Sequence, residues 1–152
     1  MPCAPWNTED IGGRICEYVR TGNVPLLKSL YESGFLKVSD RFDTTGRYRH
    51  TYHYDTTTLM YFAAQFGCEQ NHKEIIDLFL QYGDTPNGYA KDNESYDCYL
   101  SPMTEAMMYG NYDIAAYLES KGGTYDMEEL DMGSNDGWEQ KLVDARKKLM
   151  ST

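Results

Sequence analysis

Short segments in which apolar residues recur every three or four positions occur along most of the chain. The clearest are residues 22–34, 72–83 and 110–122; in the first of them Leu26, Leu27 and Leu30 share one helical face. Each segment has a polar residue where a helix would start and a glycine where it would end, and glycine readily takes the left-handed conformation that closes a helix. The pattern therefore predicts three amphipathic helices of about nine residues each.

A second predicted helix precedes each of these, over residues 58–67 and 101–110 and, in weaker form, over residues 13–22. Thr58 and Ser101 are suited to the N-cap, and Pro102 fits the first helical turn. Helices this short are marginal in water when isolated, so they need neighbours to pack against. Three successive helix–turn–helix units predict a mostly α stack of repeats.

Taken together, the three units resemble the ankyrin repeat, whose unit reads approximately TPLHLAAxxGHxEVVKLLLxxGADxN. Residues 58–64 and 72–87 match it well, residues 101–123 match it without a gap, and residues 15–34 match it mainly in their second half. The resemblance implies a single ankyrin-repeat domain over residues 1–152, a solenoid with repeats at about residues 13–34, 58–87 and 101–123. It also implies a module that binds another protein, and not an enzyme.

The chain departs from the ankyrin motif in two respects. Cys16, Tyr61 and Thr104 stand where the motif has histidine, so the hydrogen bonds of that histidine are either absent or rebuilt. Long insertions at residues 35–57 and 88–100 separate the units, and in ankyrin-like folds this link is a projecting hairpin. In the first insertion we expect strands over residues 38–43 and 48–54, with a turn at Gly46.

Two surfaces are candidates for partner binding. The hairpins are the first, because Tyr and Arg are enriched at binding hot spots; the alternative is that their aromatic side chains pack on the repeats. Their candidate residues are Arg41, Phe42, Arg47, Tyr48, Arg49, Tyr52, Tyr54 and, in the second insertion, Tyr96. The second surface lies before the closing glycine of each first helix, on the side that the ankyrin resemblance makes concave. Its candidate residues are Arg20, Phe62, Phe66, Glu105, Met108 and Tyr109. Its apolar members form either an exposed patch or, if the hairpin covers them, part of the core.

The C-terminal part of the chain contains a second kind of segment. Residues 124–137 carry five acidic and no basic residues and are expected to form a loop. Carboxylates can bind calcium, but the spacing is not that of an EF-hand, so we predict no metal site. Residues 137–150 predict a helix that caps the last repeat, because Trp138, Leu142, Ala145 and Leu149 recur at helical spacing. A helix that binds a partner is the alternative.

Composition narrows the class of protein. Hydrophobic residues make up 41% of the 152 residues, enough to form a core. No apolar run approaches the roughly 20 residues that span a bilayer, and the N-terminus lacks the pattern of a signal peptide. We therefore expect a cytoplasmic protein that does not contact membranes, with four reduced and widely spaced cysteines.

The net charge of −10 lies wholly in the second part of the chain. Residues 1–60 hold seven basic and seven acidic residues, whereas residues 61–152 hold seven basic and seventeen acidic ones, so 7 − 17 = −10. Such a surface repels nucleic acids and favours a basic protein partner, although the charge could also serve solubility alone. One specific alternative is an immunity protein or inhibitor that neutralises a basic toxin or nuclease.

Catalytic motifs are missing from the sequence. It contains no GxSxG, P-loop, HExxH or GxGxxG pattern, so we predict no catalytic residue and no cofactor. The rival hypothesis is an enzyme that uses Cys68 or Cys98 with a histidine. Cys68 and His72 are four residues apart, a spacing that brings side chains together only on a helix. The function that we expect is a monomeric module that binds a partner protein and modulates or inhibits it.

Overall fold

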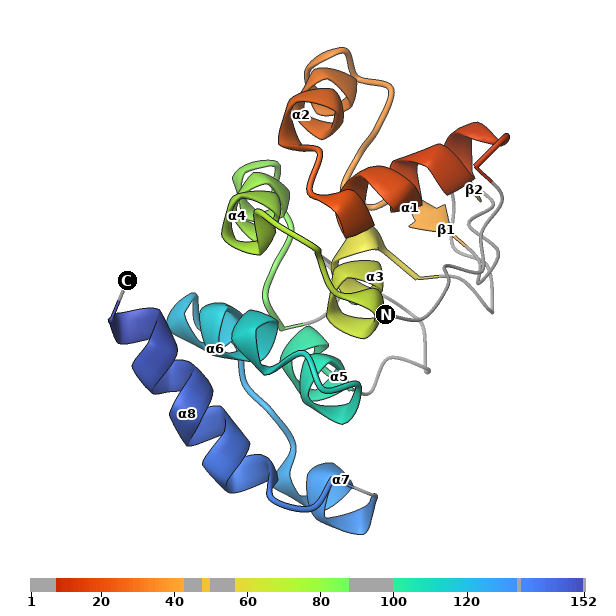
Figure 1. Ribbon diagram of the computed structural model, residues 1–152. Coiled ribbons are helices and arrows are strands. Elements are labelled where there is room, and N and C mark those ends of the chain that lie inside the picture. Colours follow the sequence, from red (N-terminus) through yellow and green to blue (C-terminus); the bar gives the residue numbers. More distant parts are fainter. Residues whose placement is uncertain (1–7, 43–47, 50–56, 88–99, 134, 152) are drawn as a thin grey trace.

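The computed structural model describes residues 8–42, 48–49, 57–87, 100–133 and 135–151. Within these ranges the chain is mostly helical, as predicted (Figure 1). The helices are α1 (Ile11–Thr21), α2 (Val24–Glu32), α3 (Leu59–Phe66), α4 (His72–Gln81), α5 (Pro102–Met108), α6 (Tyr112–Ser120), α7 (Met127–Met132) and α8 (Trp138–Met150). All six helices predicted for the three units are present.

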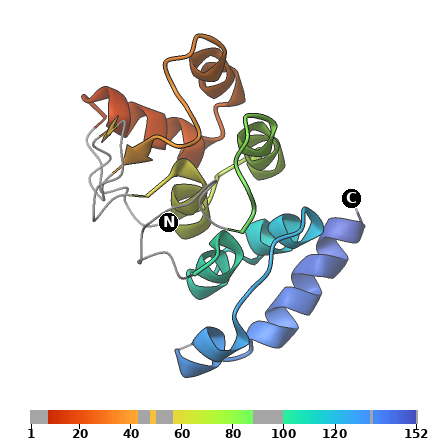
Figure 2. The same cartoon turned by 180° about the vertical axis from the view of Figure 1, so that it is seen from behind.

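The helices lie in two rows. The inner helices α1, α3, α5 and α7 contact one another in that order, and the outer helices α2, α4, α6 and α8 do the same. In both views each inner helix lies next to the outer helix that follows it in the sequence (Figures 1 and 2). We call these pairs unit 1 (α1 and α2) to unit 4 (α7 and α8).

Local signals in the sequence explain where the helices begin and end. The side chain of Asn23 accepts a hydrogen bond from the Leu26 amide at 3.3 Å and caps α2, and Ser101 accepts one from the Thr104 amide at 3.1 Å and caps α5. Gly22 closes α1 in the left-handed conformation, with φ 76°. Most residues of the predicted apolar faces lie in the core, which includes Ile15, Leu27, Ile75, Ile76, Phe79, Met103, Ile114 and Leu118. Leu26, which was predicted on the apolar face of α2, is instead 44% exposed.

Unit 4 corrects the prediction of an acidic loop. Part of that segment is the helix α7, whose N-cap Asp126 accepts hydrogen bonds from the amides of Glu128 and Glu129 at 3.0 and 3.3 Å. Acidic residues stabilise the first turn of a helix, so the run of carboxylates suits a helix start as well as a loop. The predicted C-terminal helix is confirmed as α8, which buries Trp138 and packs against α6.

The first insertion begins as a short hairpin. Strands β1 (Arg41–Phe42) and β2 (Tyr48–Arg49) pair antiparallel, with Phe42 opposite Tyr48. Phe42 also exchanges two backbone hydrogen bonds with Thr57, of 2.8 and 2.9 Å. The first strand starts later than predicted, because residues 38–40 are not part of it, while residues 43 and 50–54 of the predicted strands lie outside the described residues. The hairpin lies beside the inner helices α1 and α3. Among the described helices, none has the length and apolar character needed to cross a membrane.

Candidate functional site

The end of α1 fits closely against the loop that precedes α4. The Asn71 side chain donates a hydrogen bond from Nδ2 to the carbonyl of Gly22 at 3.0 Å. Gly22 itself has no room for a side chain, because a Cβ atom there would lie 2.1 Å from the backbone oxygen of Gln70. Residues 68–71, which form the loop between α3 and α4, therefore make one of the contacts that join unit 2 to unit 1.

An equivalent asparagine joins units 2 and 3. Asn111 Nδ2 donates to the carbonyls of Ala64 and Gln65, at 2.7 and 3.2 Å, and so satisfies two of the carbonyls at the C-terminal end of α3. The Gln65 side chain donates to Glu105 on α5 at 2.8 Å. These bonds hold the C-terminal ends of α3 and α5 side by side.

Large apolar side chains reach solvent where these two helices end. Tyr109 is 58% exposed and Met108 is 37% exposed, whereas Phe66 is half-buried and stacks on Phe62 with ring centroids 5.8 Å apart. We call the surface formed by Gln65, Phe66, Glu105, Met108 and Tyr109 the Tyr109 surface. It contains four of the candidate residues that the sequence placed near the closing glycines.

A groove of about 270 Å³ borders the Tyr109 surface. Phe66 lines it from the end of α3, and Cys68, His72, Asn111 and Tyr112 line it from the loops and the starts of the outer helices. This groove could not be predicted from the sequence, because residues about 40 positions apart form it. An aromatic or aliphatic side chain of a partner that contacts Tyr109 would have this groove beside it.

Arg20, another candidate for partner contact, has partners within the chain. Its guanidinium bonds both carboxylate oxygens of Glu17, one of them at 3.0 Å, and bonds Glu69 at 2.7 Å. The hydrogen bonds that Arg20 donates to Glu17, together with the negative charges of Glu17 and Glu69, raise the pKa of Arg20 above its usual range, although burial lowers it. Arg20 therefore ties α1 to the loop after α3.

Three candidates are buried, which corrects their predicted place on an exposed surface. Phe42 is fully buried, and its ring meets that of Phe62 edge-on with centroids 6.2 Å apart. Phe62 is itself 4% exposed and Arg41 5% exposed. The backbone pairing of Phe42 with Thr57 brings this part of the hairpin onto α3. For these residues the structure agrees with the second possibility considered from the sequence, in which the hairpin packs on the repeats.

The other hairpin candidates fall outside what the structure describes. Arg47, Tyr52, Tyr54 and Tyr96 lie outside the described residues. Of Tyr48 and Arg49, only the backbone in β2 is described. The hairpin surface that we predicted for binding stays a prediction for these six residues.

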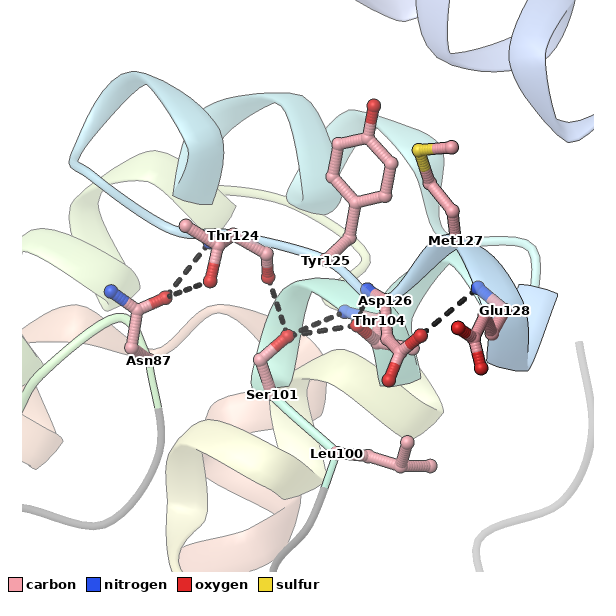
Figure 3. A pocket seen from close by; sticks show the side chains of 9 residues that line it. All are labelled: Asn87, Leu100, Ser101, Thr104, Thr124, Tyr125, Asp126, Met127 and Glu128. Carbon is pink, nitrogen blue, oxygen red and sulfur yellow. Dashed lines mark hydrogen bonds between the residues drawn. The ribbon is translucent and has the colours of Figure 1, made fainter.

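A polar pocket lies where α5 and α7 begin (Figure 3). Asn87 Oδ1 accepts from the amide and the hydroxyl of Thr124 at 2.8 and 3.0 Å, and Ser101 Oγ donates to the Thr124 carbonyl at 2.6 Å. Thr104 Oγ1 accepts from the Asp126 amide at 3.0 Å. Because these polar groups bond one another, we interpret the pocket as the junction that joins unit 3 to unit 4.

The cysteine and histidine of the rival enzyme hypothesis lie on different elements. Cys68 is in the loop before α4, and His72 is the first residue of that helix. Burial raises the pKa of the Cys68 thiol to about 12, so the thiol is protonated near neutral pH and is a weak nucleophile. Burial also lowers the pKa of His72, which keeps the imidazole neutral. Among the described residues, no three His, Cys, Asp or Glu side chains form a cluster that could hold a metal ion.

Comparisons of the chain with family models, with curated proteins and with solved structures gave no match.

Proposed function

We propose that the chain is an ankyrin-type repeat domain that binds another protein through the Tyr109 surface and has no catalytic role. The observation that carries the proposal is the exposure of Met108 and Tyr109 on helix ends that are fixed by hydrogen bonds. Exposed aromatic residues and methionine are enriched at the centres of protein interfaces.

The ankyrin assignment is supported by the hydrogen bonds between successive units. At two positions where the ankyrin motif has histidine, this chain makes bonds to the next unit with other residues. The Tyr61 hydroxyl donates to the carbonyl of Leu100 at 2.7 Å, and Thr104 Oγ1 accepts from the amide of Asp126 at 3.0 Å. The departures from the motif are therefore consistent with a rebuilt network.

The rigidity of the surface supports binding over a purely structural role. Asn111 fixes the end of α3 from the neighbouring unit, and Gln65 links α3 to Glu105 on α5. A surface that is held in one arrangement before binding loses little conformational entropy when a partner docks. Met108 and Tyr109 are consecutive residues that are 37% and 58% exposed, and neighbouring exposed apolar side chains are a more informative sign of binding than single ones.

Site-specific photo-crosslinking in the cell that naturally makes the protein tests the proposal. A photoreactive phenylalanine analogue replaces Tyr109 in one full-length variant and Met150 in a control. Met150 is 85% exposed on α8 and is not one of the residues of the Tyr109 surface. We expect one discrete protein adduct from position 109 and not from position 150. The same adducts from both positions, or no adduct from position 109, would refute the proposal.

A further inference from the structure

Charged residues in units 2 to 4 are divided between the two rows of helices. The inner helices α3, α5 and α7 carry no lysine or arginine, while α5 has one carboxylate, that of Glu105, and α7 has three. The basic residues described after residue 60 are on α4 and α8 or at the C-cap of α6. They are Lys73, Lys121, Lys141, Arg146, Lys147 and Lys148.

The cations of the outer row lie beside carboxylates of the same row. Arg146 bonds Glu119 at 2.6 Å, and Lys148 lies 3.2 Å from Asp113. Lys121 lies 3.8 Å from Asp77. These pairs offset charge within the outer row, so the outer row does not neutralise the carboxylates of the inner helices.

At the C-terminal end of α1 there is also a group with net negative charge, although Arg14 earlier in the same helix is an exposed cation. Arg20 lies between Glu17 and Glu69, so two carboxylates surround one guanidinium and the group has a charge of −1. Glu69 is 41% exposed within this group. The Tyr109 surface therefore lies between the Arg20 group of unit 1 and the acidic helix α7 of unit 4. On α7, Glu128 and Asp131 are exposed, and Glu128 is near the start of α5, at the end opposite to Tyr109.

From this division of charge we infer that the partner presents a cationic protein segment, rich in lysine or arginine and carrying an aromatic or aliphatic anchor. The inference rests on the proposed function. The anchor contacts Met108 and Tyr109, with the groove beside Phe66 available to it, and the cationic side chains face Glu105 and the carboxylates of α7. An acidic surface attracts a basic segment over several ångströms and speeds its association, while it repels nucleic acid phosphates and acidic proteins.

A peptide selection on the immobilised full-length protein tests the inference. The probe is a phage-displayed library of random linear peptides, followed by synthesis of the enriched peptides and measurement of Kd by fluorescence anisotropy. We expect enriched peptides with a net positive charge and at least one aromatic or large aliphatic residue. Their binding weakens markedly between low and high salt, because exposed charges are screened over about 10 Å at 0.1 M ionic strength.

Variants locate the binding site of the enriched peptides. Tyr109→Ala raises the Kd about tenfold or more, as expected for an anchor residue. Glu105→Gln keeps an oxygen that can accept the Gln65 hydrogen bond, and together with Glu128→Gln it raises the Kd roughly two- to fivefold. The matched control is Glu139→Gln together with Asp144→Asn, which also removes two charges, in this case from α8 on the outer row, and leaves the Kd unchanged.

The outcomes separate the inference from the proposed function. Peptides that depend on Tyr109 but are neutral or acidic, and that bind equally at high salt, would overturn the cationic partner and leave the proposed binding surface standing. Enriched peptides that are indifferent to Tyr109→Ala would overturn both. An equal effect of the Glu139→Gln and Asp144→Asn pair and of the Glu105→Gln and Glu128→Gln pair would overturn the role of the inner-row carboxylates.

Discussion

The contact between units 1 and 2 can be tested with a single added methyl group. Gly22→Ala places a Cβ atom 2.1 Å from the backbone oxygen of Gln70 and 2.9 Å from its carbonyl carbon. Gly34→Ala is the matched control, because a Cβ atom there meets nothing within 4 Å. Both glycines have positive φ angles, 76° and 81°, so alanine is strained at either position to a similar extent.

The expected losses of unfolding free energy follow from the left-handed backbone conformation and from the contact of the added Cβ atom. Left-handed backbone costs alanine about 1–2 kcal/mol at either site. At Gly22 the added atom also meets backbone, which cannot swing aside as the end of a side chain could. To reach an ordinary van der Waals distance from the new Cβ atom, the backbone of Gln70 in the loop before α4 must shift by roughly 1 Å. Overpacking of this kind costs about 1–3 kcal/mol. The totals are about 2–5 kcal/mol for Gly22→Ala and about 1–2 kcal/mol for Gly34→Ala.

Equilibrium unfolding in urea, followed by far-ultraviolet circular dichroism, measures both free energies of unfolding. We expect Gly22→Ala to lose clearly more stability than Gly34→Ala, or to be unfolded without urea. Equal losses in the two variants would show that the loop before α4 does not press on the end of α1. The packing of unit 2 on unit 1 described above would then be wrong.

Three further predictions concern single side chains. Asn111→Ala loses two hydrogen bonds to the end of α3, and we expect it to lower the free energy of unfolding in urea by about 1–3 kcal/mol. Its control, Asn23→Ala, loses one exposed cap bond and is expected to lower the free energy of unfolding by about 0.5–1 kcal/mol. Equal losses in the two variants would contradict this prediction. Burial raises the pKa of Asp84 to about 7, above the unfolded value near 3.9, so its contribution to stability is complete below about pH 4 and is lost as the pH rises to about 7. Asp84→Asn should remove this part of the pH dependence, and an unchanged profile would contradict it. Cys68 should react with iodoacetamide more slowly than free cysteine in peptide mapping by mass spectrometry, and an equal or faster rate would support the enzyme hypothesis.

The helices could be predicted because their signals are local. Asn23 and Ser101 act as N-caps and Gly22 as a helix end, as the sequence indicated. The apolar spacing also identified most of the buried residues, although Leu26, predicted on the apolar face of α2, is 44% exposed. Because Met108 and Tyr109 come directly before a glycine that follows a helix, the sequence also placed them near the exposed end of α5.

The remaining features depend on contacts between distant residues. The burial of Phe42 follows from its pairing with Thr57 and its contact with Phe62, and the alternation of residues in the hairpin cannot show which side faces the helices. The bond from Asn71 to Gly22 joins residues 49 positions apart. α7 was missed because its carboxylates suit both a solvated loop and the first turn of a helix.

The affinity of the natural partner for two variants tests the central claim most directly. The partner is the protein that crosslinks to position 109, and isothermal titration calorimetry measures its Kd for the unchanged chain, for Tyr109→Ala and for Met150→Ala. Both substitutions remove a large exposed side chain, but only Tyr109 belongs to the Tyr109 surface. We predict that Tyr109→Ala weakens binding about tenfold or more and that Met150→Ala has no effect. Equal affinity of all three proteins would contradict binding through this surface.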